Sequence, residues 1–178
     1  MIQEIGKTSE INAQGTVIKA EGQHVYPGLI MPNSTLGLGE IDAVKATRDF
    51  DEVGSLLPHV RSLIAYNAES KVVESMRPNG ILLAQVTPRG GRISGTSSIV
   101  QLDAWNWEDA AVKIDDGIHI NWPQSYLRRY EPSLSAVVSK KNEKYEKEVT
   151  ELKVFIANAK AYQKSSATKV NLPYAALK

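Results

Sequence analysis

The segment from Gly22 to Ile41 constrains the fold more than any other part of the chain. Its apolar run, residues 25–30, contains a Pro-Gly pair and stops at Met31-Pro32-Asn33. Gly and Pro punctuate local structure, and a short apolar run bounded by them is typical of a buried strand. The segment therefore predicts a buried strand that runs directly into a loop.

The bulk properties exclude several classes of protein. With 178 residues the chain is long enough for one domain with a real core. A net charge of +1 gives no reason to expect nucleic acid or an anionic membrane as a partner. Cys is absent, which excludes disulfides, thiolate metal sites and cysteine nucleophiles. No run approaches the roughly 20 apolar residues of a membrane span, and the N-terminus shows no signal peptide.

Strand patterns occur at three further places. Residues 2–7 and 16–20 alternate as two short strands joined by a polar loop, so residues 1–32 read as β structure. Residues 81–87, ILLAQVT, follow a turn and predict a buried strand. Residues 112–114 and 118–120 flank Asp115-Asp116-Gly117, and an Asp-Gly pair between alternating residues predicts a hairpin.

The last quarter of the chain predicts a long helix. From Glu131 to Lys164 there is no Gly, and the single Pro, Pro132, suits a first helical turn. One helical face carries apolar residues spaced by three and four, namely Tyr145, Val149, Leu152, Ile156 and Ala159. An amphipathic helix on the outside of the domain explains this better than a coiled coil, which needs more heptads.

A Gly- and Ser-rich stretch, residues 88–98, predicts a long polar loop before a strand at 99–102. Its glycines allow backbone N–H groups to converge on an anion, and its arginines add positive charge. The candidate anion- or substrate-binding residues are Arg89, Gly90, Gly91, Arg92 and Ser94. The alternative is a structured loop between two strands, or a lid. The pattern is neither a P-loop nor a dinucleotide fingerprint.

Two weaker candidates remain open. Trp105 and Trp107 lie among carboxylates, which suits either a stacking platform for a ring or an interface edge. The histidines, His24, His59 and His119, share no ligand spacing, and His119 reads as a surface or hairpin residue. A complete zinc site within the chain is therefore not expected.

The first barrel strand of the amidohydrolase superfamily has the pattern Pro-Gly-aliphatic-aliphatic-Asp-x-His-x-His, which the segment around Pro27 resembles. Here Met31 stands at the Asp, and Asn33 and Thr35 stand at the two metal-binding histidines. Neutral oxygen ligands hold a transition metal much less tightly than imidazole. We therefore treat Asn33 and Thr35 as positions of lost metal ligands and expect no metal in this chain, although the family usually carries zinc or another divalent metal.

Longer strings resemble one branch of that superfamily, the imidazolonepropionase-related proteins of Bacteroidetes-type bacteria. They are PNSTLGLGEIDAVKATRDFDEVG, NGILLAQVTPRGGRISGTSSIVQLDAWNWEDAA and DDGIHINWP, within residues 22–123. The resemblance implies an α/β fold, mixed α+β as a fragment. Residues 1–28 would form part of a small composite β-sandwich. Residues 29–130 would form the first strands of a (β/α) barrel with inserted loops, and residues 131–178 the long helix and tail.

The resemblance also sets the functional expectation. The chain would be the N-terminal portion of a protein that hydrolyses non-peptide C–N bonds, and would be inactive alone because its catalytic residues lie elsewhere. The alternative is a non-catalytic binding or assembly protein that retained the scaffold. Expected partners are the remainder of a parent chain or a second copy, together with a small-molecule substrate. Branch members often carry export signals, which by analogy suggests the periplasm.

Overall fold

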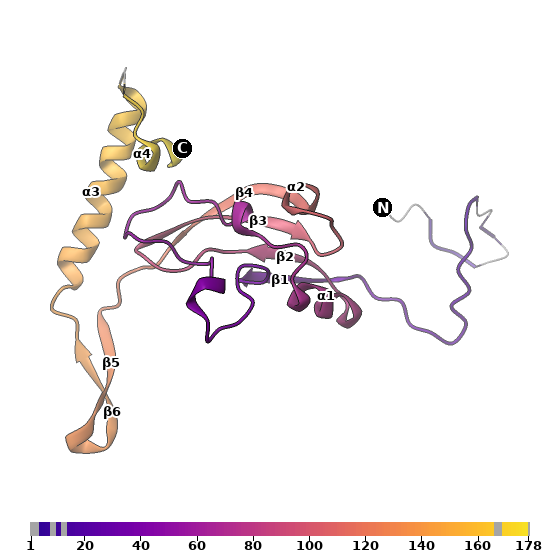
Figure 1. The fold of residues 1–178 in the computed structure, drawn as a ribbon, viewed down its shortest axis with the longest axis horizontal. Coiled ribbons are helices and arrows are strands. Elements are labelled where there is room, and N and C mark those ends of the chain that lie inside the picture. Colours follow the sequence, from indigo (N-terminus) through magenta and orange to yellow (C-terminus); the bar gives the residue numbers. More distant parts are fainter. Residues whose placement is uncertain (1–3, 8–9, 12–13, 166–168, 178) are drawn as a thin grey trace.

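A computed structural model describes residues 4–7, 10–11, 14–165 and 169–177. Its centre is a four-stranded sheet in the order β1-β2-β3-β4 (Figure 1). The strands are β1 Leu29–Ser34, β2 Ile81–Val86, β3 Ile93–Gln101 and β4 Ala111–Ile120. β1 runs parallel to β2, whereas β3 is antiparallel to both of its neighbours, β2 and β4. The chain is therefore mixed α+β.

The remaining elements are short helices, a hairpin and one long helix. The α-helices are α1 Lys71–Met76, α2 Trp107–Ala110, α3 Tyr145–Lys164 and α4 Leu172–Ala176. Four 3-10 turns are η1 Lys45–Thr47, η2 Ser62–Ala65, η3 Arg77–Asn79 and η4 Pro132–Leu134. β5 Tyr126–Glu131 pairs with β6 Ala136–Lys141 in a separate two-stranded sheet. Among the described residues, no helix is long and apolar enough to cross a membrane.

The main core lies against one face of the four-stranded sheet. Ala84, Val86 and Val100 supply the sheet side, and all three are fully buried. The covering side chains come from the segment after β1, from η2 and from α1, namely Leu36, Leu38, Leu63, Tyr66 and Val73. A second cluster joins Ile93 of β3 to Leu152 and Phe155 of α3. Burial of these side chains fixes the loops that surround the carboxyl ends of β1 and β2.

The strand predicted at residues 81–87 is confirmed as β2. The connection before it is built from local signals. Ser70 caps α1 by accepting a hydrogen bond from the Val72 N–H. Gly80 follows η3 with a φ of +82°, a left-handed conformation that suits glycine after a helical turn. The chain then enters β2 directly beside β1.

The two strands predicted near the N-terminus are wrong where the structure describes them. Residues 4–7 and 14–28 contain no strand, and Figure 1 shows the segment before β1 leading away from the sheet on the side opposite to α3. Residues 2–3 lie outside the described residues. Val17 and Ile18 are 70% and 86% exposed. Alternation alone does not make a strand, because its N–H and C=O groups need a neighbouring strand.

The long polar loop predicted at residues 88–98 is also wrong. Only residues 87–92 connect β2 to β3, and the strand begins at Ile93 instead of residue 99. The Gly- and Ser-rich letters of β3 are almost all buried. Their hydroxyl groups are satisfied by hydrogen bonds to neighbouring segments, so a polar sequence occupies the middle of the sheet.

The hairpin predicted at Asp115-Asp116-Gly117 is a bulge in one continuous strand. β4 runs through these residues and stays paired with β3 on both sides. The register passes from Ser97↔Gly117 to Ile99↔Lys113, so β4 carries extra residues here. Asp115 adopts a φ of +53°. The positive φ that the Asp-Gly signal predicts is therefore present, but it serves a bulge.

The helix predicted from Glu131 begins at Tyr145. Residues 126–141 form the β5–β6 hairpin, and Pro132 starts its connecting 3-10 turn. Ser135 ends that turn with a φ of +45°. The apolar face predicted for the helix is confirmed, because Val149, Leu152 and Ala159 are buried.

Candidate functional site

The carboxyl ends of β1 and β2 lie side by side and carry a connected set of polar side chains. The Thr87 N–H donates to the Ser34 main-chain oxygen over 2.7 Å, which closes the parallel pair. In sheets with parallel strands, ligands bind outside the carboxyl ends of the strands. This edge of the sheet is therefore a candidate functional site.

Asn33 lies at this edge in a distorted part of β1. Its φ is +49°, and the register with β2 shifts between Met31 and Ser34. The Asn33 N–H donates to Gln85 Oε1 over 3.1 Å. Arg89 donates from Nη1 to Asn33 Oδ1 and from Nη2 to the Asn33 main-chain oxygen, both over 2.6 Å. Side chains therefore supply the partners that a regular ladder would have supplied.

The contacts continue across the sheet. Gln85 Nε2 donates to Asp116 Oδ2 over 2.8 Å, and Lys113 Nζ lies 2.7 Å from Asp116 Oδ1. These hydrogen bonds hold the pKa of Asp116 below its usual value, Lys113 having the larger effect and Gln85 the smaller. We call the set Asn33, Gln85, Arg89, Lys113 and Asp116 the polar row. It holds two cations and one carboxylate, which leaves one positive charge.

His119 lies close enough to the polar row to feel its charges. Burial lowers the pKa of His119, and the positive charge of Arg89 lowers it further, while Asp116 acts in the opposite direction. The imidazole is half-buried beside Gly95 of β3. The surface hairpin residue expected from the sequence is instead part of the continuous strand β4. A neutral imidazole near a fixed guanidinium can accept a proton or a hydrogen bond.

The Gly-rich connection from β2 to β3 uses several of its main-chain groups in hydrogen bonds within the protein. The Arg89 N–H donates to the Phe50 main-chain oxygen over 2.5 Å, and the Arg92 N–H donates to the Ser55 main-chain oxygen over 2.6 Å. The Gly90 and Gly91 main-chain oxygens accept from the Asn121 amide nitrogen, over 3.1 and 3.0 Å. The main-chain oxygens of these two glycines therefore hold the Asn121 side chain.

Four of the five residues predicted as one binding loop meet at Asn121, which contacts Gly90, Gly91, Arg92 and Ser94, whereas Arg89 turns to β1. Arg89 returns to Asn33 at the end of β1. Arg92 lies 3.2 Å from Glu148 of α3. Ser94 lies in β3, where its hydroxyl donates to the Gly90 main-chain oxygen over 2.6 Å. Only Arg89 reaches the polar row.

Asn33 and Thr35 do not act as a pair. β1 ends at Ser34, so Thr35 lies outside the strand, where its main-chain oxygen accepts from the Leu38 N–H. Side chains on alternate strand residues share a face only while the strand continues. The two positions where the family pattern has histidines are therefore not oriented together on one strand.

The described residues do not fit a divalent metal ion. They contain no group of three or more His, Cys, Asp or Glu side chains that could hold one. At the end of β1, both Asn33 oxygens already accept hydrogen bonds from Arg89. A metal there would also meet the guanidinium charge.

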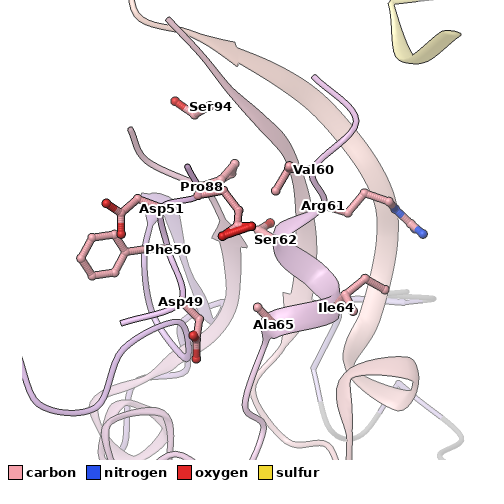
Figure 2. Close-up of a pocket in the computed structure, with 11 residues that line it drawn as sticks. Asp49, Phe50, Asp51, Val60, Arg61, Ser62, Ile64, Ala65, Pro88 and Ser94 are labelled. Carbon is pink, nitrogen blue, oxygen red and sulfur yellow. The ribbon is translucent and has the colours of Figure 1, made fainter. Parts of the chain in front are cut away.

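A hollow of about 370 Å³ lies beside the same edge of the sheet (Figure 2). Pro88 and Ser94 join it to the connection between β2 and β3, and Ile64 adds an apolar wall. Three acidic residues, Asp49, Asp51 and Glu52, also line it. Figure 2 shows the Arg61 guanidinium pointing away from Asp49 and Asp51. The carboxylates of this hollow are therefore not balanced by Arg61.

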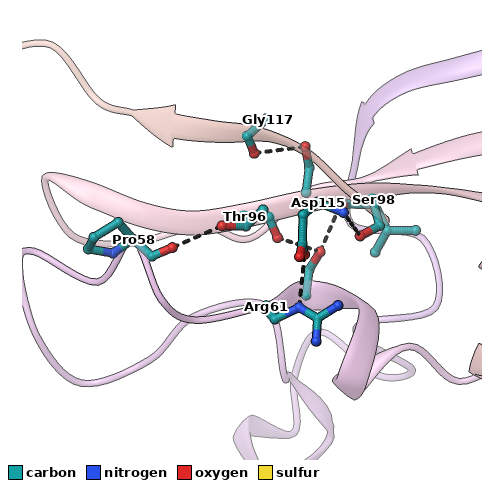
Figure 3. A network of polar contacts seen from close by, with 9 residues as sticks. Pro58, Arg61, Thr96, Ser98, Asp115 and Gly117 are labelled. Carbon is teal, nitrogen blue, oxygen red and sulfur yellow. Dashed lines mark hydrogen bonds and ion pairs between the residues drawn. The ribbon is translucent and has the colours of Figure 1, made fainter. Parts of the chain in front are cut away.

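Arg61 instead joins a network between the 58–62 segment and the β4 bulge (Figure 3). Its Nε donates to Asp115 Oδ1 over 2.8 Å, and the Asp115 N–H donates to Ser98 Oγ. The Thr96 hydroxyl donates to the Pro58 main-chain oxygen over 2.9 Å. The network fixes the bulge that also presents Asp116 to Gln85.

Sequence reasoning missed three members of the polar row, Gln85, Lys113 and Asp116. A signal for Gln85 was present, since it is the one strongly polar letter inside the run ILLAQVT, and buried polar side chains are informative. Asp116 was read as a turn residue. The Trp pair also separates, because Trp105 is 80% exposed while Trp107 packs against the main core.

One solved structure places this fold among known proteins. It is an amidohydrolase from Thermotoga maritima MSB8, with a TM-score of 0.64 and 16% sequence identity. The chain has part of an amidohydrolase fold. The similarity covers 93% of this chain and 47% of the other, so the chain spans about half the length of that protein. No protein-family model matches the chain, and no curated protein matches it.

Proposed function

We propose that this chain is the N-terminal portion of an amidohydrolase-like hydrolase of the imidazolonepropionase-related branch. The reaction would be hydrolysis of C–N bonds other than peptide bonds. In this proposal the chain contributes one wall of the site, through its polar row, and is inactive alone. The observation that carries the proposal is the shared fold, which covers nearly all of this chain but only 47% of the amidohydrolase. Fold alone does not establish function, so an activity test is needed.

The exposed apolar surface supports the view that more protein covers this chain. Val25 and Tyr26 before β1 are 85% and 78% exposed, and Leu29 and Ile30 on the edge strand β1 are each 60% exposed. A parallel edge strand with exposed apolar side chains tends to pair with further strands. We propose that the remainder of a parent chain, or a second copy, covers it. The barrel and the composite β-sandwich would be completed in this way, with boundaries near residues 28 and 130.

The test is an assay of hydrolysis by the chain alone and by its complete reading frame. The substrates would be a panel of cyclic amides, cyclic ureides and N-acyl amino acids, and the readout would be loss of substrate by mass spectrometry. We expect turnover only where residues beyond Lys178 supply the catalytic groups. Turnover by residues 1–178 alone would refute the proposal.

A binding or assembly protein is the second candidate, and the Arg89–Asn33 contact favours it. The atoms where the family pattern needs a metal ligand are already engaged with a cation. Under this alternative, the complete reading frame assembles but hydrolyses nothing in the panel. A reading frame that continues with histidines and an aspartate on later strands would favour the enzyme.

A further inference from the structure

We propose that Arg89 is a built-in cation that takes the place of a metal ion at the carboxyl end of β1. In this role it holds the strand end in shape and excludes divalent metals from it. The proposal rests on the proposed function only in treating Asn33 as the position of a family metal ligand. Arg89 is a positioning residue in this proposal.

The contact geometry is the first argument. One guanidinium donates to two oxygens of the same residue, the side-chain and main-chain oxygens of Asn33, each over 2.6 Å. The planar fork of arginine suits two oxygens held side by side, whereas a lysine ammonium is a single point charge. Hydrogen bonds from a charged donor are stronger than neutral ones. Arg89 therefore ties down Asn33 much as a coordinated cation would.

The backbone at Asn33 is the second argument. A φ of +49° and a shifted register take this residue out of the regular ladder. Its main-chain oxygen and N–H would lack strand partners without Arg89 and Gln85. Asn33 is exposed, so what these side chains add is a fixed local shape that the ladder does not supply, not the pairing of buried main-chain groups.

The charge of the polar row is the third argument. Arginine stays protonated at any ordinary pH, so Arg89 cannot give up its charge to admit a metal ion. Lys113 is paired with Asp116, which leaves the Arg89 charge uncompensated within the row. A divalent ion within a few ångström of that charge is repelled. The same positive charge helps to keep His119 neutral.

The fourth argument is the way in which the backbone positions Arg89. Its main-chain N–H is anchored to the Phe50 oxygen over 2.5 Å, and the next residue, Gly90, has a φ of +79°. A Cβ at Gly90 would lie 3.1 Å from Asp51 Cβ. The connection after β2 is therefore held so that the side chain of its first arginine returns to β1.

The exclusion of metal is tested by restoring one imidazole with and without the guanidinium. The proteins are Asn33→His, Asn33→His with Arg89→Ser, and Asn33→His with Arg129→Ser as the control. Arg129 is an exposed arginine of the β5–β6 hairpin, so its loss changes the net charge equally. The readouts are zinc affinity by isothermal titration calorimetry and the visible spectrum with cobalt.

We expect Asn33→His with Arg89→Ser to bind zinc at least tenfold more tightly than Asn33→His alone. The control should match Asn33→His, which would separate a local effect from a change in net charge. Equal zinc affinities with and without Arg89, including no measurable binding in either, would overturn the exclusion. Neither result bears on hydrolysis by the complete reading frame, so the two proposals fail independently.

The positioning role is tested by amide hydrogen exchange in Arg89→Ser, Arg89→Lys and Arg129→Ser. We expect peptides covering residues 29–36 to exchange at least tenfold faster in Arg89→Ser, and to an intermediate extent in Arg89→Lys. Exchange in Arg129→Ser should match the parent chain. Unchanged exchange in Arg89→Ser would overturn the positioning role. Should Arg89→Ser not fold, Arg89→Lys carries the test, and parent-like exchange in it would overturn the role.

Discussion

Strand β3 and the β5–β6 hairpin reverse the usual relation between polarity and burial. β3 reads ISGTSSIVQ, and all but two of its nine residues are buried. The hairpin carries large apolar side chains, yet Tyr126, Tyr130 and Val137 are 61%, 58% and 65% exposed. In β3 the hydroxyl groups find partners in neighbouring segments. The comparison teaches that a polar strand can lie inside this chain when its groups find hydrogen-bond partners, whereas apolar side chains stay exposed where no neighbouring segment covers them.

The two regions also differ in what surrounds them. β3 lies between β2 and β4, and at Thr96 its edge also pairs with the 58–62 segment through a parallel bridge to Arg61. The hairpin forms its own two-stranded sheet and, as Figure 1 shows, stands away from the four-stranded sheet, below α3. A lone hairpin is marginally stable in water. The following experiments test whether stability is concentrated in β3, and they run from the largest expected effect to the smallest.

Gly95→Ala should have the largest effect, because it strikes the closest approach of a loop to β3. Gly95 has a φ of +137°, and a Cβ there would lie 2.5 Å from the Val60 main-chain oxygen. We expect a loss of roughly 3–5 kcal/mol in the free energy of unfolding, measured by urea denaturation. Gly80→Ala is the control. Gly80 also has a positive φ, but nothing lies within 4 Å of its Cβ position, so its loss should be about 1 kcal/mol.

Thr96→Val should cost about 1–3 kcal/mol in the free energy of unfolding. The substitution keeps the shape but removes the hydrogen bond to the Pro58 oxygen and leaves that oxygen unpaired. Val137→Thr in the exposed hairpin is the matched reverse change and should stay within about 0.5 kcal/mol. Similar losses at both sites would show that the hairpin is as well packed in solution as β3.

Tyr66→Phe should stabilise the protein, a change in the free energy of unfolding of opposite sign to the two preceding ones. The Tyr66 hydroxyl is buried and has no hydrogen-bond partner among the described residues. Burial raises the pKa of Tyr66 to about 12, which shows how poorly the site accepts its charge. We expect a gain of about 1 kcal/mol in the free energy of unfolding. A loss of that size would indicate that an ordered water satisfies the hydroxyl.

Replacing Tyr130 and Val137 together by Ser tests the hairpin directly. These residues form a cross-strand pair near its end. We expect less than about 0.5 kcal/mol of change in global stability, because exposed positions contribute little. The binding of a hydrophobic dye should fall as apolar surface is lost. A loss of about 2 kcal/mol in the free energy of unfolding would show that the hairpin contributes to global stability, as β3 does.

The smallest effect concerns pH. The pKa of His119 is lowered in the folded state, chiefly by burial, so the unfolded chain binds this proton more readily. Stability should therefore fall as the pH drops through the ordinary histidine value of 6.5. In His119→Gln, the slope of unfolding free energy against pH should be shallower between about pH 7 and 5. Identical slopes in His119→Gln and the parent chain would indicate that folding leaves the pKa of His119 unchanged, as expected for an imidazole in contact with water.

Local signals predicted several elements of this fold. The run ILLAQVT between a turn and a loop predicted β2, and the spacing of Val149, Leu152 and Ala159 predicted the buried face of α3. The start of that helix was misplaced, because residues 126–141 contain no Gly to mark a hairpin turn. Apolar and polar residues alternate only weakly along these two strands, and their side chains remain largely exposed, so the pattern does not mark them as strands.

The candidate site was predictable only in part. The sequence singled out Asn33 and Arg89 separately, one as a lost ligand and the other as a loop cation. Their contact joins residues 56 positions apart, and no local pattern encodes it. Gln85 and Asp116 were missed because a glutamine inside an apolar strand and an aspartate in an Asp-Gly pair gain their partners only through the sheet register.

The sequence by itself determined that this chain lacks the paired histidines of the amidohydrolase pattern, that β2 forms where it does, and which face of α3 is buried. These are properties of residue type and local spacing. Tertiary structure decided that Asp115-Asp116-Gly117 is a bulge, that the Ser and Thr residues of β3 lie inside, and that Arg89 holds Asn33. The physical reason is that strand register and hydrogen-bond partners are supplied from distant parts of the chain, and the buried Ser and Thr groups of β3 must find such partners.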